Sequence, residues 1–209
     1  AMHGVPCNSP LITPRSVLAI SGCACLLRRK ALDQVGLFDD RYFAYCEDTD
    51  LCLRIVRAGW DIRAVPTARI THFYSHTGGK FSLRKVYWVE RNHFWVSLNN
   101  YPATLVVLLP ALTLWRFALM AAALFRGVPS VKGFRSSSSL PAVLAVMAAA
   151  HLRVLVGIPS ALWQRFAQRR CIVLPAREWR RRLLTEHMGI WEAVTGLGAP
   201  VLPMKEGPE

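Results

Sequence analysis

The sequence predicts an α/β domain over its first hundred residues, followed by a region of apolar helices that associate with a membrane. Two observations support this. In the first hundred residues, short β-rich segments alternate with segments whose apolar residues recur at helical spacing. After residue 101, two long apolar segments follow in a basic context. The chain has 209 residues and is 53% hydrophobic, which is too apolar for a disordered protein.

The elements of the first half can be predicted in chain order from periodicity and from turn-forming residues. Gly36 and Gly59 each follow a helical segment and are expected to end it. The predicted segments are a buried strand broken at Gly22 (16–27), a helix (29–35), an irregular loop (37–45), a helix (48–58), two short strands (60–65 and 68–72) and a helix (82–99).

Three carboxylates lie within four residues at the start of the 48–58 helix. Neighbouring residues on a helix point in different directions, so Glu47, Asp48 and Asp50 cannot share one role. Asp50 stands four residues before Arg54, the favourable order for an ion pair on the helix surface. Asp48, at or beside the N-cap, is left as the candidate for chemistry. The alternative is capping of the free N–H groups, which is worth roughly 0.5–2 kcal/mol.

The segment from Phe43 to Arg54, followed by Ala-Gly-Trp, resembles the Glu-Asp segment of family-two glycosyltransferases, particularly their bacterial rhamnosyltransferase-like branch. The resemblance runs from about residue 17 to about residue 102. Further blocks stand in the family's order: Ser21 to Arg29, Val35 to Asp39, His72 to Gly79 and Tyr87 to Asn92.

This resemblance implies a GT-A fold and the transfer of a sugar, with inversion, from a nucleotide-diphosphate sugar to a hydroxyl of a lipid-linked or glycan acceptor. The implied pathway is bacterial cell-surface polysaccharide synthesis. Asp48, with Glu47 beside it, would be the catalytic base. His72 would help to hold a divalent metal, Mg²⁺ or Mn²⁺, with His76 as the competing candidate.

The implied substrate-binding residues come from three of these blocks. Gly22 and Cys23 lie in the predicted strand, where small side chains let substrate approach the backbone. Close packing against a helix is the alternative for that strand. Gly78 and Gly79 form a turn whose N–H groups could cradle phosphate. Arg91 matches a family residue near the acceptor, although such charges also serve as solvated surface.

The resemblance also implies an incomplete enzyme. The family's N-terminal half supplies the first βαβ units and an Asp-x-Asp motif, and the sequence upstream of Asp33 has no such motif. Residues 1–100 are therefore expected to be the C-terminal, acceptor-side half of a GT-A domain, with an incomplete metal site. Residues 101–165 would form the membrane-associated helical region and 166–209 a basic tail, with an unstructured end from about residue 198.

The apolar region admits two arrangements. Leu105 to Phe125 has one charge, Arg116, and as one helix would be about 31 Å long. Its apolar residues contribute roughly −3 to −7 kcal/mol to insertion and a central Arg costs roughly 2.5–3.5, so crossing is favoured. Leu140 to Trp163 is nearer break-even, because it contains His151, Arg153 and two prolines. Both segments could cross the membrane, or both could lie in its plane.

Charge and cysteine content favour the cytoplasmic face of a membrane. Between residues 116 and 182 there are twelve Lys or Arg against one acid, Glu178, as suits an anionic membrane surface. The six cysteines lack metal-ligand spacing, which predicts reduced and mostly buried thiols. A catalytically inactive membrane adaptor is the alternative function. Nucleic-acid binding is disfavoured because the basic residues adjoin apolar helices rather than an aromatic stacking surface.

Overall fold

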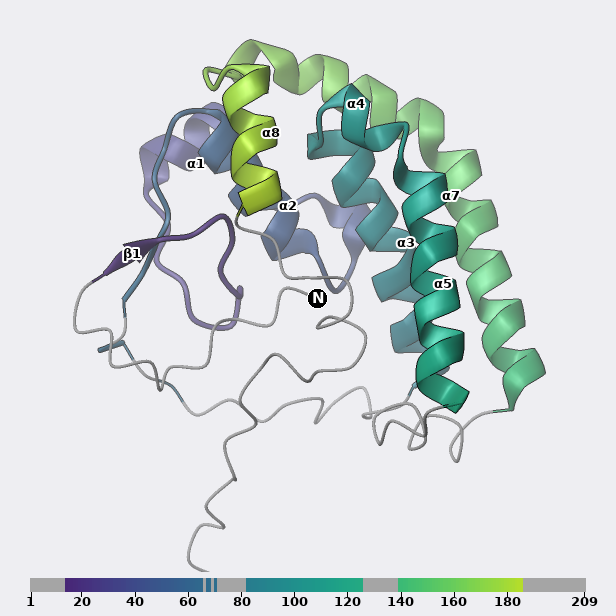
Figure 1. The fold of residues 1–209 in the computed structure, drawn as a ribbon. Coiled ribbons are helices and arrows are strands. Elements are labelled where there is room, and N and C mark those ends of the chain that lie inside the picture. The colour runs from purple at the N-terminus through teal and green to yellow at the C-terminus, as the bar shows by residue number, and fades with distance from the viewer. Residues whose placement is uncertain (1–13, 66, 69, 71–81, 126–138, 186–209) are drawn as a thin grey trace, which may run out of the picture.

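The computed structural model describes residues 14–65, 67, 68, 70, 82–125 and 139–185, and this part of the chain is mainly helical (Figure 1). Its elements run in the following order: β1 Arg15–Ser16, α1 Arg29–Val35, η1 Asp40–Tyr42, α2 Glu47–Arg57, β2 Arg63–Ala64, α3 Leu83–Asn100, α4 Ala103–Val106, α5 Leu109–Phe125, α7 Leu140–Gln168, η2 Arg169–Cys171 and α8 Ala176–Thr185.

Helices α1, α2 and α3 agree with the predicted helices to within a residue. Gly36 and Gly59 follow α1 and α2 with φ values of 83° and 89°. These left-handed conformations carry little penalty for glycine, which is why it commonly closes a helix. Helix α2 buries its side chains almost all round from residue 50 onward, because it lies in the hydrophobic core.

The predicted sheet is not seen among the described residues. β1 and β2 form an antiparallel pair of two residues each, with Arg15 opposite Ala64 and Ser16 opposite Arg63. The prediction of a buried strand over residues 16–27 is wrong beyond Ser16, since residues 21–26 are exposed and Gly22 lies in a turn. A strand needs a neighbour to take its hydrogen bonds. Past Val17, whose N–H donates to the carbonyl of Ile62, no described strand supplies one.

The single helix predicted for Leu105 to Phe125 is also wrong. The chain turns at Val107 and Leu108, between α4 and α5. Pro110 explains the break, because it has no N–H to donate and its ring crowds the carbonyl four residues earlier. The 17 residues of α5 give a length of about 25 Å.

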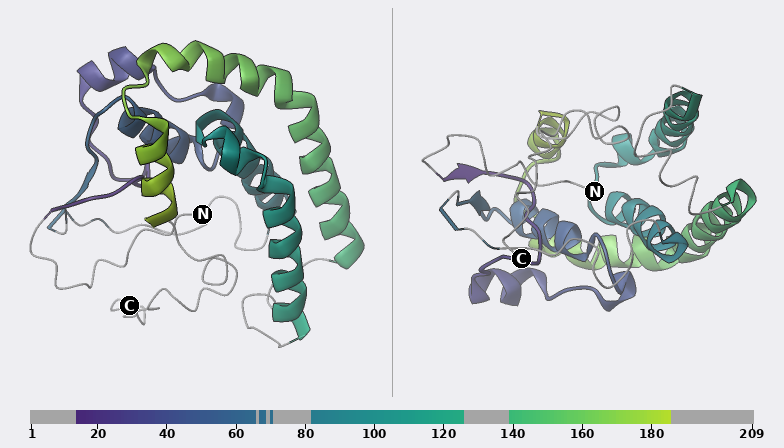
Figure 2. Two further views of the ribbon diagram at one scale, coloured as in Figure 1. Left: turned by 45° about the horizontal axis from the view of Figure 1, so that its top comes forward. Right: turned by 90° about the horizontal axis from the view of Figure 1, so that it is seen from below.

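Helix α7 is longer than predicted. Together with η2 it forms, within the described residues, the one helix that is long and apolar enough to cross a membrane. Pro159 lies inside α7, which explains its bend over the ends of α3 and α4 toward α1 and α8 (Figures 1 and 2).

Helix α7 packs along α3 in the largest contact between two elements. At Gly157 the helices are so close that a Cβ would lie 2.9 Å from Nε1 of Trp95. The contact joins the predicted regions 1–100 and 101–165, and residue 165 lies inside α7. Whether these regions fold as separate domains stays a prediction.

Candidate active site

The three acids at the start of α2 have separate environments. Asp50 is fully buried and its Oδ2 accepts a hydrogen bond from Nε of Arg54 at 2.8 Å. Its Oδ1 accepts from the hydroxyl of Tyr42 at 3.1 Å and from the amide of Asn100 at 2.7 Å. The predicted pair of Asp50 with Arg54 is confirmed, but its place on the helix surface is wrong.

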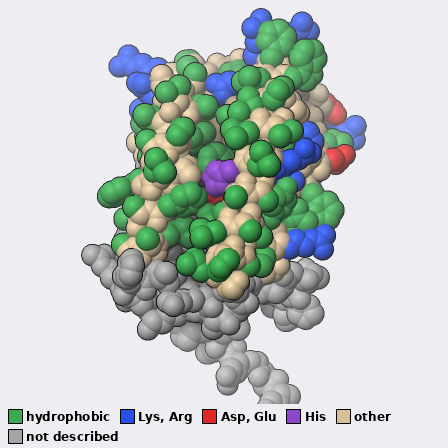
Figure 3. Space-filling view, turned by 90° about the vertical axis from the view of Figure 1, so that its right-hand side faces the viewer, with side chains coloured by type: hydrophobic (Ala, Val, Ile, Leu, Met, Phe, Trp, Pro, Cys, Tyr) green, Lys and Arg blue, Asp and Glu red, His purple; other side chains and the backbone are tan. Residues whose placement is uncertain are grey.

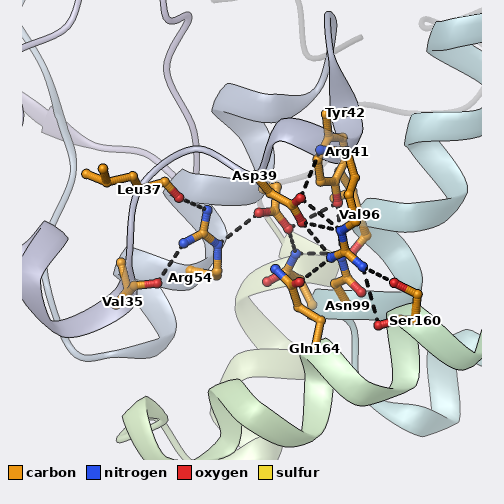
Figure 4. Close-up of polar contacts among 12 residues, drawn as sticks. Val35, Leu37, Asp39, Arg41, Tyr42, Arg54, Val96, Asn99, Ser160 and Gln164 are labelled. Atoms are coloured by element: carbon orange, nitrogen blue, oxygen red, sulfur yellow. Dashed lines mark hydrogen bonds and ion pairs between the residues drawn. The ribbon is translucent and has the colours of Figure 1, made fainter.

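This ion pair can be buried because the other nitrogens of Arg54 also have hydrogen-bond partners. Nη1 donates to the carbonyl of Val35 at 2.7 Å and Nη2 to the carbonyl of Leu37 at 2.8 Å, so the guanidinium closes the end of α1 (Figure 4). A buried charge is tolerated when hydrogen bonds and an opposite charge satisfy it. Burial, and then the charge of Asp50, raise the pKa of Tyr42 well above 10. Tyr42 therefore remains a neutral donor.

Asp48 is partly exposed and belongs to no ion pair among the described residues. Its Oδ2 accepts from the backbone N–H of Gly22 at 2.9 Å. Its Oδ1 accepts from the backbone N–H of Thr49 at 2.7 Å and from the Thr49 hydroxyl at 3.3 Å. The structure therefore brings Asp48 and Gly22 together, while Oδ2 of Asp48 keeps a lone pair for another partner.

Glu47 precedes Asp48 in the first turn and is half-buried. Its Oε2 is enclosed and has no hydrogen-bond partner in the described part of the chain. Burial, and to a lesser extent the neighbouring Asp48, raise the pKa of Glu47 above its usual value. An enclosed carboxyl with a raised pKa, one residue from an ion-pair-free carboxylate, is an arrangement seen at sites of proton transfer.

The loop that leads into α2 has an unusual backbone. Phe43, Tyr45 and Cys46 have φ values of 62°, 69° and 66°, although none is glycine. Such conformations are costly for residues with a Cβ and persist only where the surroundings enforce them. They lie directly before Glu47 and Asp48, so this loop determines where both carboxyl groups point.

Two neighbouring residues of α3 hold this loop. The amide of Asn92, which is fully buried, donates to the carbonyls of Tyr42, Ala44 and Tyr45 at 3.0, 2.8 and 2.7 Å. Nη2 of Arg91 donates to the carbonyls of Arg41 and Tyr42 at 3.1 and 2.9 Å. The two side chains bond each other as well, from Nε of Arg91 to Oδ1 of Asn92 at 2.8 Å.

Arg91 was predicted to bind the acceptor. In the structure its side chain is buried, donates to the loop carbonyls and stacks on Trp95, with the guanidinium carbon 4.6 Å from the ring centroid. These contacts give Arg91 a role in positioning the loop. A direct contact with substrate stays a prediction.

A second network joins the loop to α7. The Nε–H of Arg41 is shared between the two carboxylate oxygens of Asp39, at 2.9 and 3.1 Å, and Arg41 also contacts Ser160 and Gln164 of α7 (Figure 4). Burial works against the charge of Asp39, but the hydrogen bonds and charge of Arg41 outweigh it and lower the pKa of Asp39. Sequence reasoning missed this network and the role of Asn92, because both depend on residues far apart in the chain.

The cysteines differ from the prediction of mostly buried thiols. Cys23 and Cys25 are exposed beside Gly22, whereas Cys52 is buried and Cys46 is partly buried. The exposure follows from the missing strand at residues 21–26. Burial raises the pKa of Cys46 and of Cys52 to about 11. All described cysteines are free, and the exposed pair lies beside the hydrogen bond between Gly22 and Asp48.

The remaining predicted site residues, His72, its competitor His76, Gly78 and Gly79, lie outside the described residues. Within the residues that the structure describes, no three His, Cys, Asp or Glu side chains are grouped closely enough to hold a metal ion. The predicted metal site therefore cannot be built from Asp48 and its described neighbours alone.

Comparison with known proteins finds a family whose sequences resemble the part of the chain that contains this site. Residues 11–100 match the family described as "Glycosyltransferase like family 2". This span includes Gly22, Asp48 and Asn92, so these residues lie in the part of the chain that is similar to that family. The resemblance to family-two glycosyltransferases and their rhamnosyltransferase-like branch is confirmed.

Individual relatives are rhamnosyltransferases. The N-acetylglucosaminyl-diphospho-decaprenol L-rhamnosyltransferase of Mycobacterium tuberculosis is 47% identical over 66 residues, which are 32% of this chain and 22% of the relative. Rhamnosyltransferase WbbL of Escherichia coli K12 is 35% identical over 74 residues, 35% of this chain and 28% of the relative. The chain thus matches less than a third of the length of these curated relatives. No solved structure shows a significant match.

Proposed function

We propose that the protein transfers a sugar from a nucleotide-diphosphate sugar to a hydroxyl of a lipid-linked acceptor, with inversion at the anomeric carbon, in cell-surface polysaccharide synthesis. The match of residues 11–100 to a glycosyltransferase family supports sugar transfer. The names of the relatives support rhamnose as the sugar and a diphosphate-linked polyprenol as the acceptor.

The observation that carries the proposal is the state of Asp48. It is partly exposed, free of ion pairs within the described chain, and oriented by the N–H of Gly22 at 2.9 Å. Its neighbour Asp50 is sealed into a buried pair with Arg54 and is unavailable for proton transfer. Of these two aspartates, Asp48 is the one that a substrate can reach.

In the proposed reaction Asp48 takes the proton of the acceptor hydroxyl as its oxygen attacks the anomeric carbon. The new bond joins that oxygen to the anomeric carbon, and the bond from the carbon to the nucleotide diphosphate breaks. The electron pair leaves with the diphosphate. Attack opposite the leaving group inverts the anomeric carbon. General base catalysis of this kind contributes roughly 10²–10⁴-fold in rate.

Glu47 and the loop before it support this step. The half-buried carboxyl of Glu47 stands one residue before Asp48, and the two groups influence each other electrostatically. Arg91 and Asn92 hold the loop carbonyls and thereby set the direction of the first turn of α2. Gly22 and Cys23 would line the acceptor side, because they stand against Asp48 in an exposed turn.

We further propose that transfer depends on Mg²⁺ or Mn²⁺, with His72 among the ligands. The described residues do not complete such a site, so none of the steps above runs through a metal. Activity that survives a strong chelator and is not raised by either ion would contradict this dependence.

The base assignment is tested by Asp48→Asn and Thr49→Ala. Both are assayed in the 209-residue chain with labelled nucleotide-diphosphate sugars, rhamnosyl donors included, and a polyprenyl-diphosphate N-acetylglucosamine acceptor. We expect Asp48→Asn to lower transfer by roughly 10²-fold or more, while Thr49→Ala keeps most of it. Undiminished transfer by Asp48→Asn would refute the assignment.

Binding is followed separately through Cys23 and Cys25. Both thiols are exposed beside Gly22 and should react quickly with iodoacetamide. Acceptor bound at Asp48 should protect Cys23, in Asp48→Asn as well as in the unaltered protein. Protection without transfer in Asp48→Asn would show that the variant binds but lacks its base. Absence of protection in the unaltered protein would place the acceptor elsewhere.

A further inference from the structure

Helices α5 and α7 together present a broad apolar surface to the outside. Figure 3 looks onto the side of the molecule that these helices form, and hydrophobic side chains cover both of them. The large exposed members are Leu112, Leu114, Trp115, Met120, Leu140, Leu144, Leu152, Leu155, Val156, Leu162, Trp163 and Phe166. We call this set the outer apolar face. A contiguous apolar surface of this size marks an interaction site.

Two polar side chains of these helices, Arg116 and His151, are turned inward. Arg116, the single charged residue of α5, pairs with Glu90 of α3, whose side chain is 6% exposed. Nε2 of His151, on α7, lies 3.5 Å from the same carboxylate oxygen of Glu90. In Figure 3 a histidine lies in the furrow between the two helices. The charge in α5 is thus compensated inside the protein, and the outer apolar face is left free of it.

The packing of α7 against α3 argues against crossing a bilayer. The face of α3 that is buried in the protein carries Glu90, Arg91, Asn92, Asn99 and Asn100. A helix pair that crossed the bilayer with this packing intact would bring α3 and its polar side chains to the hydrocarbon core, where they are costly. Two of these side chains also hold the loop in front of Asp48. Arg41, at the start of that loop, contacts Ser160 and Gln164 of α7, so α7 cannot leave this packing without disturbing the loop.

The length of α5 and the position of Arg153 on α7 also argue against helices that cross the bilayer. Helix α5 is about 25 Å long, shorter than the hydrocarbon core of about 30 Å. Arg153 is exposed near the middle of α7, three residues after the buried Ala150, so it lies on the flank of the outer apolar face. In a crossing helix this guanidinium would lie deep in the bilayer. In a helix parallel to the surface it reaches the head groups.

Basic side chains adjoin the same surface. In Figure 3 they lie at the margins of the outer apolar face, at one end and along one side. Two exposed arginines, Arg169 and Arg170, directly follow α7, and three more, Arg177, Arg180 and Arg181, lie on α8, which stands beside α1 and α2 rather than beside α5 (Figure 1). An apolar surface with a basic margin is complementary to a bilayer that carries anionic head groups.

We propose that α5 and α7 lie along the surface of an anionic bilayer, with the outer apolar face embedded in it, and that neither helix crosses it. This rests on the proposed function only in taking the membrane as the location of the acceptor. A chain without transferase activity would still bind vesicles in this way, so the two proposals can fail independently.

Sidedness is tested with Ser139→Cys, at the end of α7 farthest from α8 in the chain. The full chain is synthesised cell-free in the presence of unilamellar vesicles of phosphatidylcholine with phosphatidylglycerol. Floated vesicles are treated with a membrane-impermeant maleimide, and the labelled peptides are identified by mass spectrometry. We expect complete labelling at position 139 before detergent is added, with Cys23 as the internal reference. Protection of position 139 until detergent is added would mean that the helices cross, and would overturn the proposal.

The surface itself is tested by placing charge on it. Leu155→Asp with Trp163→Asp should lower the floated fraction roughly tenfold, because two large side chains no longer enter the bilayer. The matched control, Leu26→Asp with Leu37→Asp, alters two strongly exposed leucines outside α5 and α7 and should float normally. Omitting phosphatidylglycerol should weaken flotation of the unaltered chain. No flotation with either lipid, or a dimer in solution that Leu155→Asp and Trp163→Asp dissociate, would show that another partner covers this face.

Discussion

Replacing Asn92 with Asp tests whether α3 holds the loop in front of the candidate base. The two side chains have nearly the same shape, but the carboxylate has no hydrogen to donate. Three carbonyls, those of Tyr42, Ala44 and Tyr45, would lose their donor. The amide has two N–H hydrogens to share among these carbonyls, so at about 0.5–1.5 kcal/mol for each of two hydrogen bonds the expected cost is roughly 1–3 kcal/mol. A better pairing of the new carboxylate with Arg91 would offset part of it.

Cys46 reports on the loop directly. It lies within the loop, is partly buried, and burial raises its pKa to about 11, so it should alkylate slowly at pH 8. Opening the loop returns the thiol toward its ordinary pKa of about 8.5 and exposes it. If Asn92→Asp weakens the loop by about 2 kcal/mol, the open fraction rises more than tenfold. Alkylation of Cys46, followed by peptide mass spectrometry, should accelerate accordingly.

The control must lower global stability without touching the loop. Leu183→Ala removes a buried side chain on α8 and should cost roughly 2–5 kcal/mol. The two variants are compared at urea concentrations that give equal global stability. If Cys46 then reacts no faster in Asn92→Asp than in Leu183→Ala, the side chain of Asn92 does not hold the loop and the positioning role assigned to it is wrong.

Two further predictions concern packing and pH. Gly157→Ala should lower the urea midpoint, because the new Cβ would lie 2.9 Å from Nε1 of Trp95. The overpacking costs roughly 1–3 kcal/mol, which outweighs the gain of about 1 kcal/mol in helix propensity. Adding Trp95→Phe should restore part of the lost stability, and an unchanged midpoint in either variant would contradict the close contact. Asp39 has a lowered folded pKa, so its pairing with Arg41 stabilises the fold above the unfolded pKa of about 3.8 and is lost as pH falls through the lower folded value. Urea midpoints between pH 5 and pH 2 should therefore fall more steeply in the unaltered protein than in Asp39→Asn, and parallel curves would rule out this contribution.

Several features of the chain follow from local sequence. Helices α1, α2 and α3 could be predicted within a residue, because helical periodicity and a following glycine act over a few neighbouring residues. The i,i+4 spacing of Asp50 and Arg54 predicted their pairing for the same reason. The break between α4 and α5 also had a local signal in Pro110, which the length and apolarity of the segment concealed.

Other features depended on residues distant in the chain. Asp50 and Arg54 are buried rather than superficial because Tyr42, Asn100 and the carbonyls at the end of α1 enclose them. The strand predicted beyond Ser16 did not form, since a strand requires a partner that its own sequence cannot supply. Nothing in the residues around Phe43 indicated a left-handed backbone there.

The sequence by itself determined helices α1, α2 and α3, the resemblance to family-two glycosyltransferases and the pairing of Asp50 with Arg54, because these depend on short spacings and on motifs in a particular order. Only the tertiary structure decided that Asn92 and Arg91 hold the loop before Asp48, and that the charge of α5 turns inward to Glu90. Both are contacts between helices separated by tens of residues, and their geometry arises only when α2, α3, α5 and α7 pack together.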